Sequence, residues 1–546
     1  MGLSSFDRAA VIARLKSEQF DVLIVGGGIT GAGIALDAAA RGLKTGLIEK
    51  HDFAFGTSSR STKLIHGGLR YLKQLEFALV KEVGSERAIV HQLAPHLVVP
   101  EKMLLPLYEQ KGLGYWLTSV GLKIYDWLAG VKEEDRRRML TKPQTTRLEP
   151  LLKPDDIKGG AIYAEYRTDD ARLTIEVAKR AREHGATVIN YVGARDFLYE
   201  KGRVSGVVAE DALTGENFRV SALVVINATG PWVDELRELN NSRKGNYLHL
   251  TKGVHVVVPY HRFAVRQAIY FDVQDGRMIF AIPRGRVTYI GTTDTDYVDD
   301  KNMVTASAED ARYLLRAVNE TFPSVHLTLA DIESSWAGLR PLIHEEGKSA
   351  SELSRKDEIF ESETGLISIA GGKLTGYRKM AERVVDRIIG QSFEDRDLTA
   401  CFTDRIYLGG ERLSTDAEVK KYTQEVAGRV EGLGLKGMEG SYLVHLYGKQ
   451  ADEIIGYCEK HVHEDAEVGL ALAELWFALH HEMITTLSDF LVRRTGLLYF
   501  NMHRMVKIME PVLQSMAQQL KWELPRIDEE RQVMKQLIED ATKAKG

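Results

Sequence analysis

The chain has 546 residues, of which 44% are hydrophobic and 27% charged, so it is an ordinary globular protein of two or three domains rather than one simple core. The formal net charge of −5 and the pI of about 6.4 exclude a general nucleic-acid binder. Two cysteines, Cys401 and Cys458, exclude a disulfide framework and a CxxC redox centre.

The amino-terminal segment MGLSSFDRAAVIARLKSEQF lacks the apolar stretch of a signal peptide. No later apolar run reaches the length that spans a membrane. The sequence therefore predicts a cytoplasmic protein, at most bound to one face of a membrane.

The strongest local motif is DVLIVGGGITGAGIALDAAARGLKTGLIEK, residues 21–50. An apolar strand leads into Gly26, Gly28 and Gly31, which occupy the G-x-G-x-x-G positions before an alanine-rich helix. These glycines permit a tight turn, the approach of a pyrophosphate and close packing of helix on strand, and the helix amino terminus favours phosphate. Glu49, at the end of the second strand, is placed to accept hydrogen bonds from a ribose. The motif predicts dinucleotide binding, by either NAD or FAD.

Two distant segments favour FAD. LVVINATGPW, residues 223–232, has the form of the strand that returns beside the dinucleotide in glutathione-reductase-like flavoproteins. In GLISIAGGKLTGYRKMAERVVDRII, residues 365–389, a buried strand meets Gly371-Gly372 and a helix begins, which suits the pyrimidine edge of a flavin. A second nicotinamide-type motif is missing, so NAD(P)H is expected to be neither donor nor acceptor.

The remaining segments predict the other domains. Residues 267–297 alternate apolar and polar side chains around turns, which predicts an antiparallel meander, and ALTGENF, residues 212–218, predicts a hairpin. Residues from about 80 to 150 are expected to be mainly helical, and helical spacing resumes beyond 400. The fold class is α/β: a Rossmann FAD domain (1–80, 155–232 and 360–395), an antiparallel-sheet substrate domain (81–154 and 233–359) and an all-helical carboxyl-terminal domain (400–546).

Four cations are candidates for binding a small phosphate or carboxylate: Arg70, Arg340, Arg355 and Lys373. Arginine binds such oxyanions through two parallel hydrogen bonds. For each arginine the alternative is a surface salt bridge, which the Gly-Leu-Arg-Pro setting of Arg340 disfavours. His66 is a candidate base for a substrate hydroxyl, with a structural histidine as the alternative.

The segment GTSSRSTKLIHGGLRYL, residues 56–72, combines both tasks. Its hydroxyl-rich first half is expected to follow the FAD pyrophosphate and ribityl chain. Its second half turns on Gly67-Gly68 and is expected to bring His66, Arg70 and Tyr71 to the reactive face of the flavin.

Several of these motifs together resemble the FAD-dependent glycerol-3-phosphate dehydrogenase family, bacterial aerobic type: GGGITGAGIALDAAARG, GTSSRSTKLIHGGLRYL, DDARL, NATGPW, KGVHVVVP, GTTDTDY, GLRPL and GGKLTGYRKMAE. The resemblance spans nearly the whole chain, with TLSDFLVRRTGL resembling the family's cap domain. It implies oxidation of sn-glycerol 3-phosphate to dihydroxyacetone phosphate, with FAD as cofactor and membrane quinone as electron acceptor.

The resemblance also implies roles for residues. Arg340 and Arg355 would hold phosphate, Arg70 and Tyr71 would line the pocket, and His66 or Lys373 would assist removal of the C2 hydroxyl proton. Catalytic roles therefore fall to His66, Lys373 and Arg340. The predicted FAD contacts are Gly26, Gly28, Ile29, Thr30, Gly31, Glu49, Lys50, Thr57, Ser58, Ser59, Thr62, Lys63, Leu64, His66, Gly67, Gly68, Val192, Ala228, Thr229, Gly230, Trp232, Gly372, Lys373, Leu374 and Thr375.

The sequence leaves other assignments open. A glycerol-3-phosphate oxidase would share the fold and half-reaction, an amino-acid or 2-hydroxyacid oxidoreductase could use the same arginines, and a flavin-binding sensor or membrane-associated interaction protein would need no catalysis. The aromatic stretch 112–130 is either core or a membrane interface, the latter implying a peripheral protein on the inner face of the cell membrane. The histidine pairs lack metal-ligand spacing, so no metal is predicted. The oligomeric state, a homodimer included, is left open.

Overall fold

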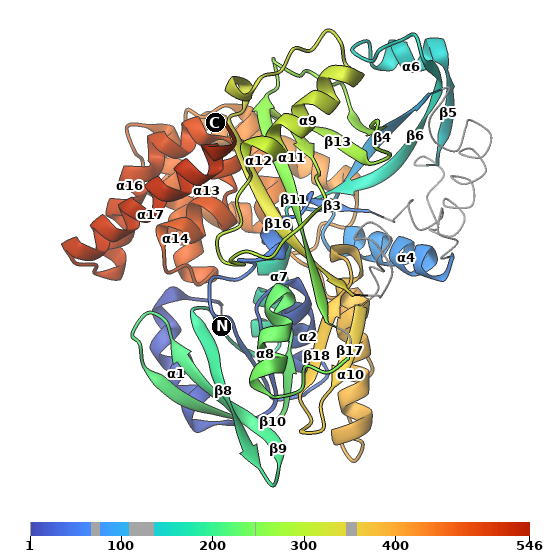
Figure 1. Ribbon diagram of the computed structural model, residues 1–546. Helices are drawn as coiled ribbons and strands as arrows, with labels where there is room; N and C mark the ends of the chain where they lie inside the picture. Colours follow the sequence, from blue (N-terminus) through green and yellow to red (C-terminus); the bar gives the residue numbers. More distant parts are fainter. Residues whose placement is uncertain (1, 67–76, 109–135, 246, 345–356, 546) are drawn as a thin grey trace.

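The computed structural model describes residues 2–66, 77–108, 136–245, 247–344 and 357–545. Two sheets stand one above the other in Figure 1, and the carboxyl-terminal helices lie beside them. The chain passes between the two sheets several times, so segments far apart in sequence meet where the sheets adjoin.

The first sheet is built around parallel strands, in the order β17-β18-β10-β1-β2-β7, with β9 and β8 continuing from β10. β1 pairs in parallel with β10 and β2, and β10 in parallel with β18. Val22, Leu23 and Ile24 of β1 are fully buried, as expected for a central strand covered on both faces. The strands are β1 (Gln19–Val25), β2 (Thr45–Ile48), β7 (Thr187–Ile189), β8 (Val192–Glu200), β9 (Arg203–Asp211), β10 (Asn217–Asn227), β17 (Asp357–Glu361) and β18 (Ile367–Gly371).

Helices α2 and α7 pack against each other, and α10 packs against α2. Alanine and glycine in α2 permit this close approach, since a Cβ on Gly33 would lie 3.0 Å from the Tyr377 ring of α10. The expected strand-helix-strand unit, the returning strand at residue 223 and the strand and helix after residue 365 are confirmed. The helices of this region are α1 (Arg8–Ser17), α2 (Ile29–Ala40), α7 (Asp170–Glu183), α8 (Val233–Leu239) and α10 (Tyr377–Ser392).

The second sheet is mainly antiparallel and follows the order β15-β11-β14-β13-β12-β4-β6-β3, with β16 on β11 and β5 on β6. The expected meander is confirmed in β12, β13 and β14, and the expected hairpin joins β9 to β10. The strands are β3 (Leu64–Ile65), β4 (Val99–Tyr108), β5 (Arg138–Thr141), β6 (Ile157–Arg167), β11 (Leu248–Pro259), β12 (Ala268–Asp272), β13 (Met278–Arg284), β14 (Val287–Gly291), β15 (Thr295–Asp296) and β16 (Ser334–Ile343).

The expectation of a mainly helical segment between about residues 80 and 150 is wrong in part for the described residues. Residues 109–135, with the aromatic stretch 112–130, lie outside them. Helix α4 (Phe77–Leu93) and the short α6 (Lys142–Leu148) are present, but β4 and β5 lie in the second sheet. β4 is paired along most of its length with β6. That partner follows some 50 residues later, so local spacing alone did not reveal the strand.

The carboxyl-terminal region is helical, as expected. Its helices are α11 (Asp416–Gly432), α12 (Gly437–Tyr447), α13 (Ala451–Lys460), α14 (Ala466–His481), a π-helix (Asp489–Arg494), α15 (Leu497–Phe500), α16 (Met502–Leu520) and α17 (Leu524–Thr542). α9 (Ala308–Thr321) belongs instead to the second-sheet region.

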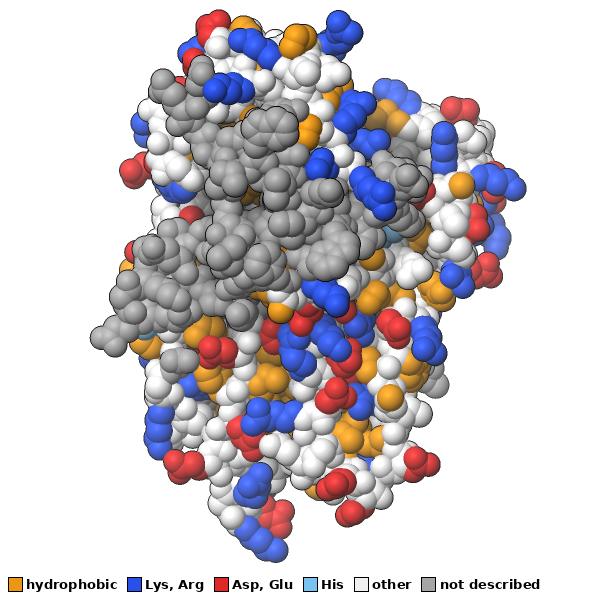
Figure 2. Space-filling model, turned by 90° about the vertical axis from the view of Figure 1, so that its right-hand side faces the viewer, with side chains coloured by type: hydrophobic (Ala, Val, Ile, Leu, Met, Phe, Trp, Pro, Cys, Tyr) orange, Lys and Arg blue, Asp and Glu red, His pale blue; other side chains and the backbone are white. Residues whose placement is uncertain are grey.

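The proposed limits of the three domains stay a prediction. Within them, β3 and β6 pair in the second sheet although their residues fall in the ranges expected for the FAD domain. None of the helices that the structure describes has the length and apolar content needed to cross a bilayer. On the face shown in Figure 2, Lys and Arg side chains are interspersed with Asp and Glu side chains below the grey region.

Candidate functional site

The glycine motif closes tightly between β1 and α2. Gly26 has a φ of 115°, and a Cβ there would lie 2.5 Å from the carbonyl oxygen of Ala228. A Cβ on Gly31 would overlap the carbonyl oxygen of Gly26. Only glycine therefore fits either position. Gly28 is the N-cap of α2, and the N–H of Ile29 donates to Ser58 Oγ at 3.0 Å.

Glu49 lies beside this motif at the end of β2. Its carboxylate accepts from the backbone N–H groups of Gly27 at 2.6 Å and His51 at 2.8 Å. Burial raises the pKa of Glu49, and these two hydrogen bonds oppose the rise. The acid is therefore held against the backbone of the glycine motif.

Lys50, the residue after Glu49, packs against an aromatic ring. The Lys50 ammonium lies 4.4 Å from the centre of the Trp232 ring, and burial lowers the pKa of Lys50. The N–H of Val192 donates to the Glu49 carbonyl at 2.7 Å. Segments 49–50, 192 and 232, which are all expected to contact FAD, are thus brought together. The contacts with FAD themselves stay predictions.

These features fit FAD. The backbone of residues 26–31 has the compact turn and helix amino terminus that a pyrophosphate requires, and the Glu49 carboxylate beside it has the chemistry to accept from ribose hydroxyls, a contact that stays a prediction. Ala228 continues the returning strand through its N–H bond to the Val25 carbonyl at 2.9 Å. Thr229 Oγ1 donates to Asn227 Oδ1 at 2.7 Å, and the 3-10 helix Gly230–Trp232 follows. Thr30 lies in the first turn of α2.

The hydroxyl-rich segment links the two sheets. Thr57 Oγ1 donates to the Leu339 carbonyl of β16 at 2.7 Å, and Thr62 Oγ1 lies 3.0 Å from His255 Nε2 of β11. Ser59 is buried in the 3-10 helix Thr57–Ser59. The segment therefore runs from the glycine motif to the long strands of the second sheet.

Lys63 has a φ of 58° and a buried side chain. Its ammonium group donates to the Ser59 carbonyl at 3.1 Å and to Asp170 Oδ1. The N–H of Ser61 donates to the other oxygen of Asp170 at 2.9 Å. Asp170 thus binds the Lys63 ammonium, and the expected contact of Lys63 with FAD stays a prediction.

β3 ends beside the second flavin segment. The N–H of His66 donates to Thr375 Oγ1 at 3.1 Å, and Thr375 Oγ1 lies at the same distance from the His66 carbonyl. Leu64 belongs to β3, while Leu374 and Thr375 belong to the 3-10 helix Leu374–Gly376. Two segments about 310 residues apart are thus joined backbone to side chain. The segments that carry the two candidate bases, His66 and Lys373, are therefore adjacent.

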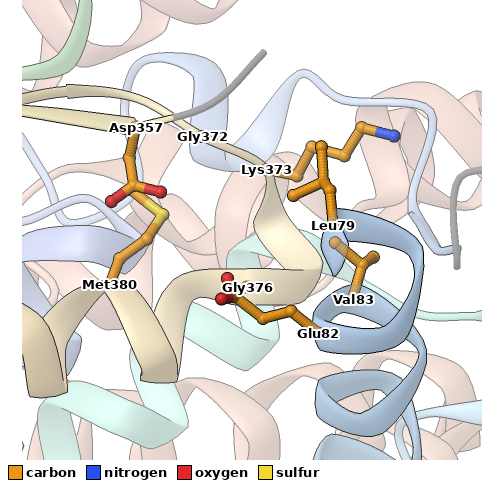
Figure 3. Close-up of a pocket in the computed structure, with 8 residues that line it drawn as sticks. All are labelled: Leu79, Glu82, Val83, Asp357, Gly372, Lys373, Gly376 and Met380. Atoms are coloured by element: carbon orange, nitrogen blue, oxygen red, sulfur yellow. The ribbon is translucent and has the colours of Figure 1, made fainter. Parts of the chain in front are cut away.

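A pocket lies behind this junction, between α4 and the start of α10. Apolar side chains of Leu79, Val83 and Met380 line it, together with Gly372. Figure 3 shows the Lys373 side chain extending over Leu79, with Met380 and Asp357 on the opposite side. Lys373 therefore leaves the loop on the α4 side.

Arg340 is held in a fixed orientation on β16. Its Nη1 lies 3.1 Å from Asp294 Oδ1 and 3.2 Å from the Thr293 carbonyl, and its Nη2 donates to Thr292 Oγ1 at 2.9 Å. The guanidinium lies over Gly253 of β11, where a Cβ would overlap it. The fork of the guanidinium is thus oriented before any ligand binds.

Five predicted site residues lie outside the described residues: Gly67, Gly68, Arg70, Tyr71 and Arg355. Their roles stay predictions. The described part of the site brings together the glycine motif, the segment 57–66, Arg340 and the loop 372–375.

The residues that hold Arg340 and the segment 57–66 in place were not singled out from the sequence. Thr292, Thr293 and Asp294 lie in GTTDTDY and Asp170 in DDARL, so both motifs were noticed without assigning these contacts. His255, in KGVHVVVP, is buried and stacks on Trp336 with ring centres 4.7 Å apart. The available signals were a histidine inside the apolar strand β11, and hydroxyl and carboxylate residues directly after β14 and at the start of α7.

Comparisons with known proteins agree with this geometry. Residues 21–378 match the family model described as FAD dependent oxidoreductase, and residues 401–527 match the C-terminal domain of alpha-glycerophosphate oxidase. The aerobic glycerol-3-phosphate dehydrogenase of Bacillus subtilis is 46% identical over 543 residues, covering 98% of both chains. That of Staphylococcus aureus strain USA300 is 46% identical over 546 residues, covering 99% of this chain and 98% of the relative.

A solved structure is similar over the same length. The glycerol-3-phosphate dehydrogenase from Bacillus halodurans complexed with FAD has a TM-score of 0.85 and 43% identity, with 99% of each chain covered. An L-alpha-glycerophosphate oxidase from Mycoplasma pneumoniae, 19% identical with a TM-score of 0.57, shares the fold. The chain therefore belongs to the FAD-dependent oxidoreductases and, within them, to the aerobic glycerol-3-phosphate dehydrogenase family.

Proposed function

We propose that this protein oxidises sn-glycerol 3-phosphate to dihydroxyacetone phosphate, with FAD as cofactor and a membrane quinone as the final electron acceptor. The observation that carries the proposal is the hydrogen bond from Thr57 to the Leu339 carbonyl. It joins the segment that follows the dinucleotide motif to the strand position next to Arg340. This bond therefore links the segment after the glycine motif to the residue that precedes Arg340, the proposed oxyanion ligand.

Arg340 is the proposed phosphate ligand. Its Nη1 and Nη2 are already oriented by Asp294 and Thr292, so little side-chain freedom is lost when a ligand binds. A phosphate dianion carries more charge than the Asp294 carboxylate and accepts two parallel hydrogen bonds from a guanidinium. Arg355 is the proposed second phosphate ligand, with Arg70 and Tyr71 lining the same pocket.

His66 and Lys373 are the proposed groups for moving the proton of the C2 hydroxyl. Oxidation of a secondary alcohol releases this proton while the C2–H bond breaks. FAD, when bound, supplies the acceptor for the hydride. The bonds between Thr375 and the His66 backbone support the assignment, because they hold the His66 and Lys373 segments side by side.

Anaerobic addition of glycerol 3-phosphate to the yellow protein tests the oxidation. Loss of the flavin absorbance is expected, and an unchanged spectrum would contradict the function. His66→Ala and Lys373→Met separate the two candidate bases in the same experiment. The variant that lacks the base should lose at least a hundredfold in the rate of bleaching, in line with general-base catalysis.

The electron acceptor is tested separately. Oxygen is the alternative acceptor, because the carboxyl-terminal region matches the family model of a glycerophosphate oxidase domain. Turnover with a quinone analogue under argon, together with little hydrogen peroxide in air, is the expected result. Peroxide formed in proportion to substrate consumed would instead establish an oxidase.

Peripheral attachment to the inner face of the cell membrane is part of the proposal, because a membrane quinone has to reach the protein. Co-sedimentation with vesicles containing quinone would support it. A protein that stays in the supernatant while reducing the same vesicle quinone would contradict it. A homodimer is proposed with this arrangement and is tested by light scattering of the FAD-loaded protein.

A further inference from the structure

A buried carboxylate, Asp52, lies three residues after Glu49 and is fully shielded from solvent. Arg494 donates to both of its oxygens, from Nη1 at 2.7 Å and Nη2 at 2.9 Å. Arg493 Nε adds a bond of 2.5 Å, and Asn190 Nδ2 one of 3.1 Å. Burial alone would raise the pKa of Asp52, but Arg494 and Arg493 hold it below its usual range. Asp52 is therefore an anion whose cationic partners are two buried arginines.

Both arginines come from the carboxyl-terminal domain. They end the π-helix Asp489–Arg494, more than 440 residues from Asp52. Arg493 Nη2 is anchored by Asp489 at 2.7 Å, and Arg494 Nη2 by the Glu482 carbonyl at 2.8 Å. π-Helical turns are rare and occur frequently at functional sites. Here the π-helix presents two adjacent arginines to one carboxylate.

The turn that contains Asp52 touches the glycine motif directly. The N–H of Ala54 donates to the Gly27 carbonyl at 3.1 Å, and a Cβ on Gly27 would lie 2.8 Å from the Phe53 ring. Glu49 accepts from the other side of the same residue, the Gly27 N–H. Gly27 is thus held through both its N–H and its carbonyl by the segment 49–54.

The turn also has an unfavourable backbone conformation. Ala54 has a φ of 62°, a left-handed value that alanine rarely adopts. Such a conformation persists where the surrounding structure over-determines it. The Phe55 N–H bond to the Asp52 carbonyl at 3.1 Å closes the turn, and the arginines hold Asp52 in place. The carboxyl-terminal domain is therefore in contact with the element that fixes Gly27.

We propose that the carboxyl-terminal domain is a structural part of the FAD site, with Arg493 and Arg494 as positioning residues that hold Asp52 and thereby fix Gly27 and Glu49 for the cofactor. We name Asp52, Arg493 and Arg494 the clamp. The inference rests on the assignment of FAD to the glycine motif and adds a role for the clamp in retaining FAD.

The test is a titration of apoprotein with FAD, followed by flavin fluorescence. Arg494→Lys keeps a cation but loses the two parallel bonds to Asp52 and the bond to the Glu482 carbonyl. The dissociation constant for FAD should rise at least tenfold. With FAD saturating, the KM for glycerol 3-phosphate should stay within twofold, because Arg340 and its partners are separate from the clamp.

Arg504→Lys is the matched control. Arg504 is likewise a buried arginine of the carboxyl-terminal domain, bonded to Glu439 at 2.6 Å and 3.6 Å from Glu474. Neither partner touches the segment 49–54. Its replacement should lower the melting temperature of the apoprotein while leaving FAD affinity within twofold of wild type.

The outcomes separate the two assignments. Wild-type apoprotein that does not bind FAD would overturn the cofactor assignment itself. Wild type that binds FAD, with Arg494→Lys binding equally well, would overturn the clamp. Equal weakening in Arg494→Lys and Arg504→Lys would also overturn it, because general loss of domain stability would then be the cause.

Hydrogen exchange on the wild-type protein gives a second measurement that needs no variant to fold. Coupling between two sites is reciprocal, so FAD should slow amide exchange in residues 489–494 more than in the distant helix α11. Equal slowing in the two segments, or no slowing in residues 489–494, would overturn the proposal.

Discussion

The two ends of the proposed site, the dinucleotide end and the Arg340 end, depend on different parts of the chain. At the dinucleotide end the backbone makes the site: Gly26 and Gly31 leave no room for a Cβ, and their neighbours are main-chain carbonyls. At the Arg340 end side chains make the site, and Gly253 and Thr292 serve to place one guanidinium. At the backbone end, a single added Cβ causes a steric clash that should abolish most of the binding. At the side-chain end, different substitutions can weaken binding by different amounts. Substitutions at the two ends should therefore separate cofactor binding from substrate binding.

The largest effect is expected from Gly31→Ala. Because a Cβ would overlap the Gly26 carbonyl oxygen, α2 has to move away from β1. The dissociation constant for FAD should rise about a thousandfold, about 4 kcal/mol, as measured by titration of the apoprotein. Gly428→Ala, in α11 where an added Cβ would meet no atom within 4 Å, should bind FAD like wild type. Wild-type affinity in Gly31→Ala would refute the steric account.

Arg340→Lys should have the second-largest effect, on the substrate alone. Lysine cannot make two parallel bonds to phosphate. The ratio kcat/KM for glycerol 3-phosphate should fall about a hundredfold, about 3 kcal/mol, with FAD absorbance retained. The exposed Arg316 of α9 supplies a control, Arg316→Lys, expected to match wild type. Loss of FAD from Arg340→Lys would remove the distinction between the two ends.

Glu474 lies outside both ends and tests stability alone. Burial raises its pKa from 4.5 to about 7, against the nearby Arg504 and the Tyr442 and Tyr447 hydroxyls. Between about pH 4.5 and 7 the native state thus holds a proton that the unfolded state has released. The contribution of Glu474 to stability should therefore be greatest below this range and fall as the pH rises through it.

The corresponding variant is Glu474→Gln, which cannot titrate. Relative to this variant, wild type should lose about 2 kcal/mol between pH 5 and pH 8, as measured by urea unfolding. FAD affinity and KM should be unchanged. Parallel stability curves for the two proteins would show that Glu474 does not titrate in this range.

Gly253→Ala should have the smallest effect. The added Cβ enters the space of the Arg340 guanidinium, but that group ends a flexible side chain and can shift. The KM for glycerol 3-phosphate should rise about tenfold with kcat nearly unchanged, about 1.4 kcal/mol. Gly390→Ala, at an uncrowded position of α10, provides the comparison. An unaltered KM would mean that the position of Arg340 is not critical for substrate.

The contrast between the ends also explains what the sequence could predict. The β1-α2-β2 unit and Glu49 lie within about 30 residues, and glycine spacing with an apolar strand is a local pattern. β10 and β18 were recognisable for the same reason. β4 was not, because its strand character depends on pairing with β6.

Side-chain contacts across long separations escaped prediction for a physical reason. Arg340 is oriented by Thr292 and Asp294, a contact that needs the register of β11, β14 and β16. The clamp joins residues 442 positions apart. An arginine in a helical pattern has the same appearance whether it meets solvent or a buried carboxylate, so burial and partner emerge only from the fold.

The parallel pairing of β1, β10 and β18 has a consequence for biosynthesis. β1 ends at Val25, whereas β18 begins at Ile367. At about 5–20 residues per second, β18 follows β1 by roughly 20 to 70 s. The arginines of the π-helix are translated later still. A nascent chain therefore displays the whole glycine motif long before it can complete the sheet around it, and a message truncated before codon 367 encodes the motif without the site.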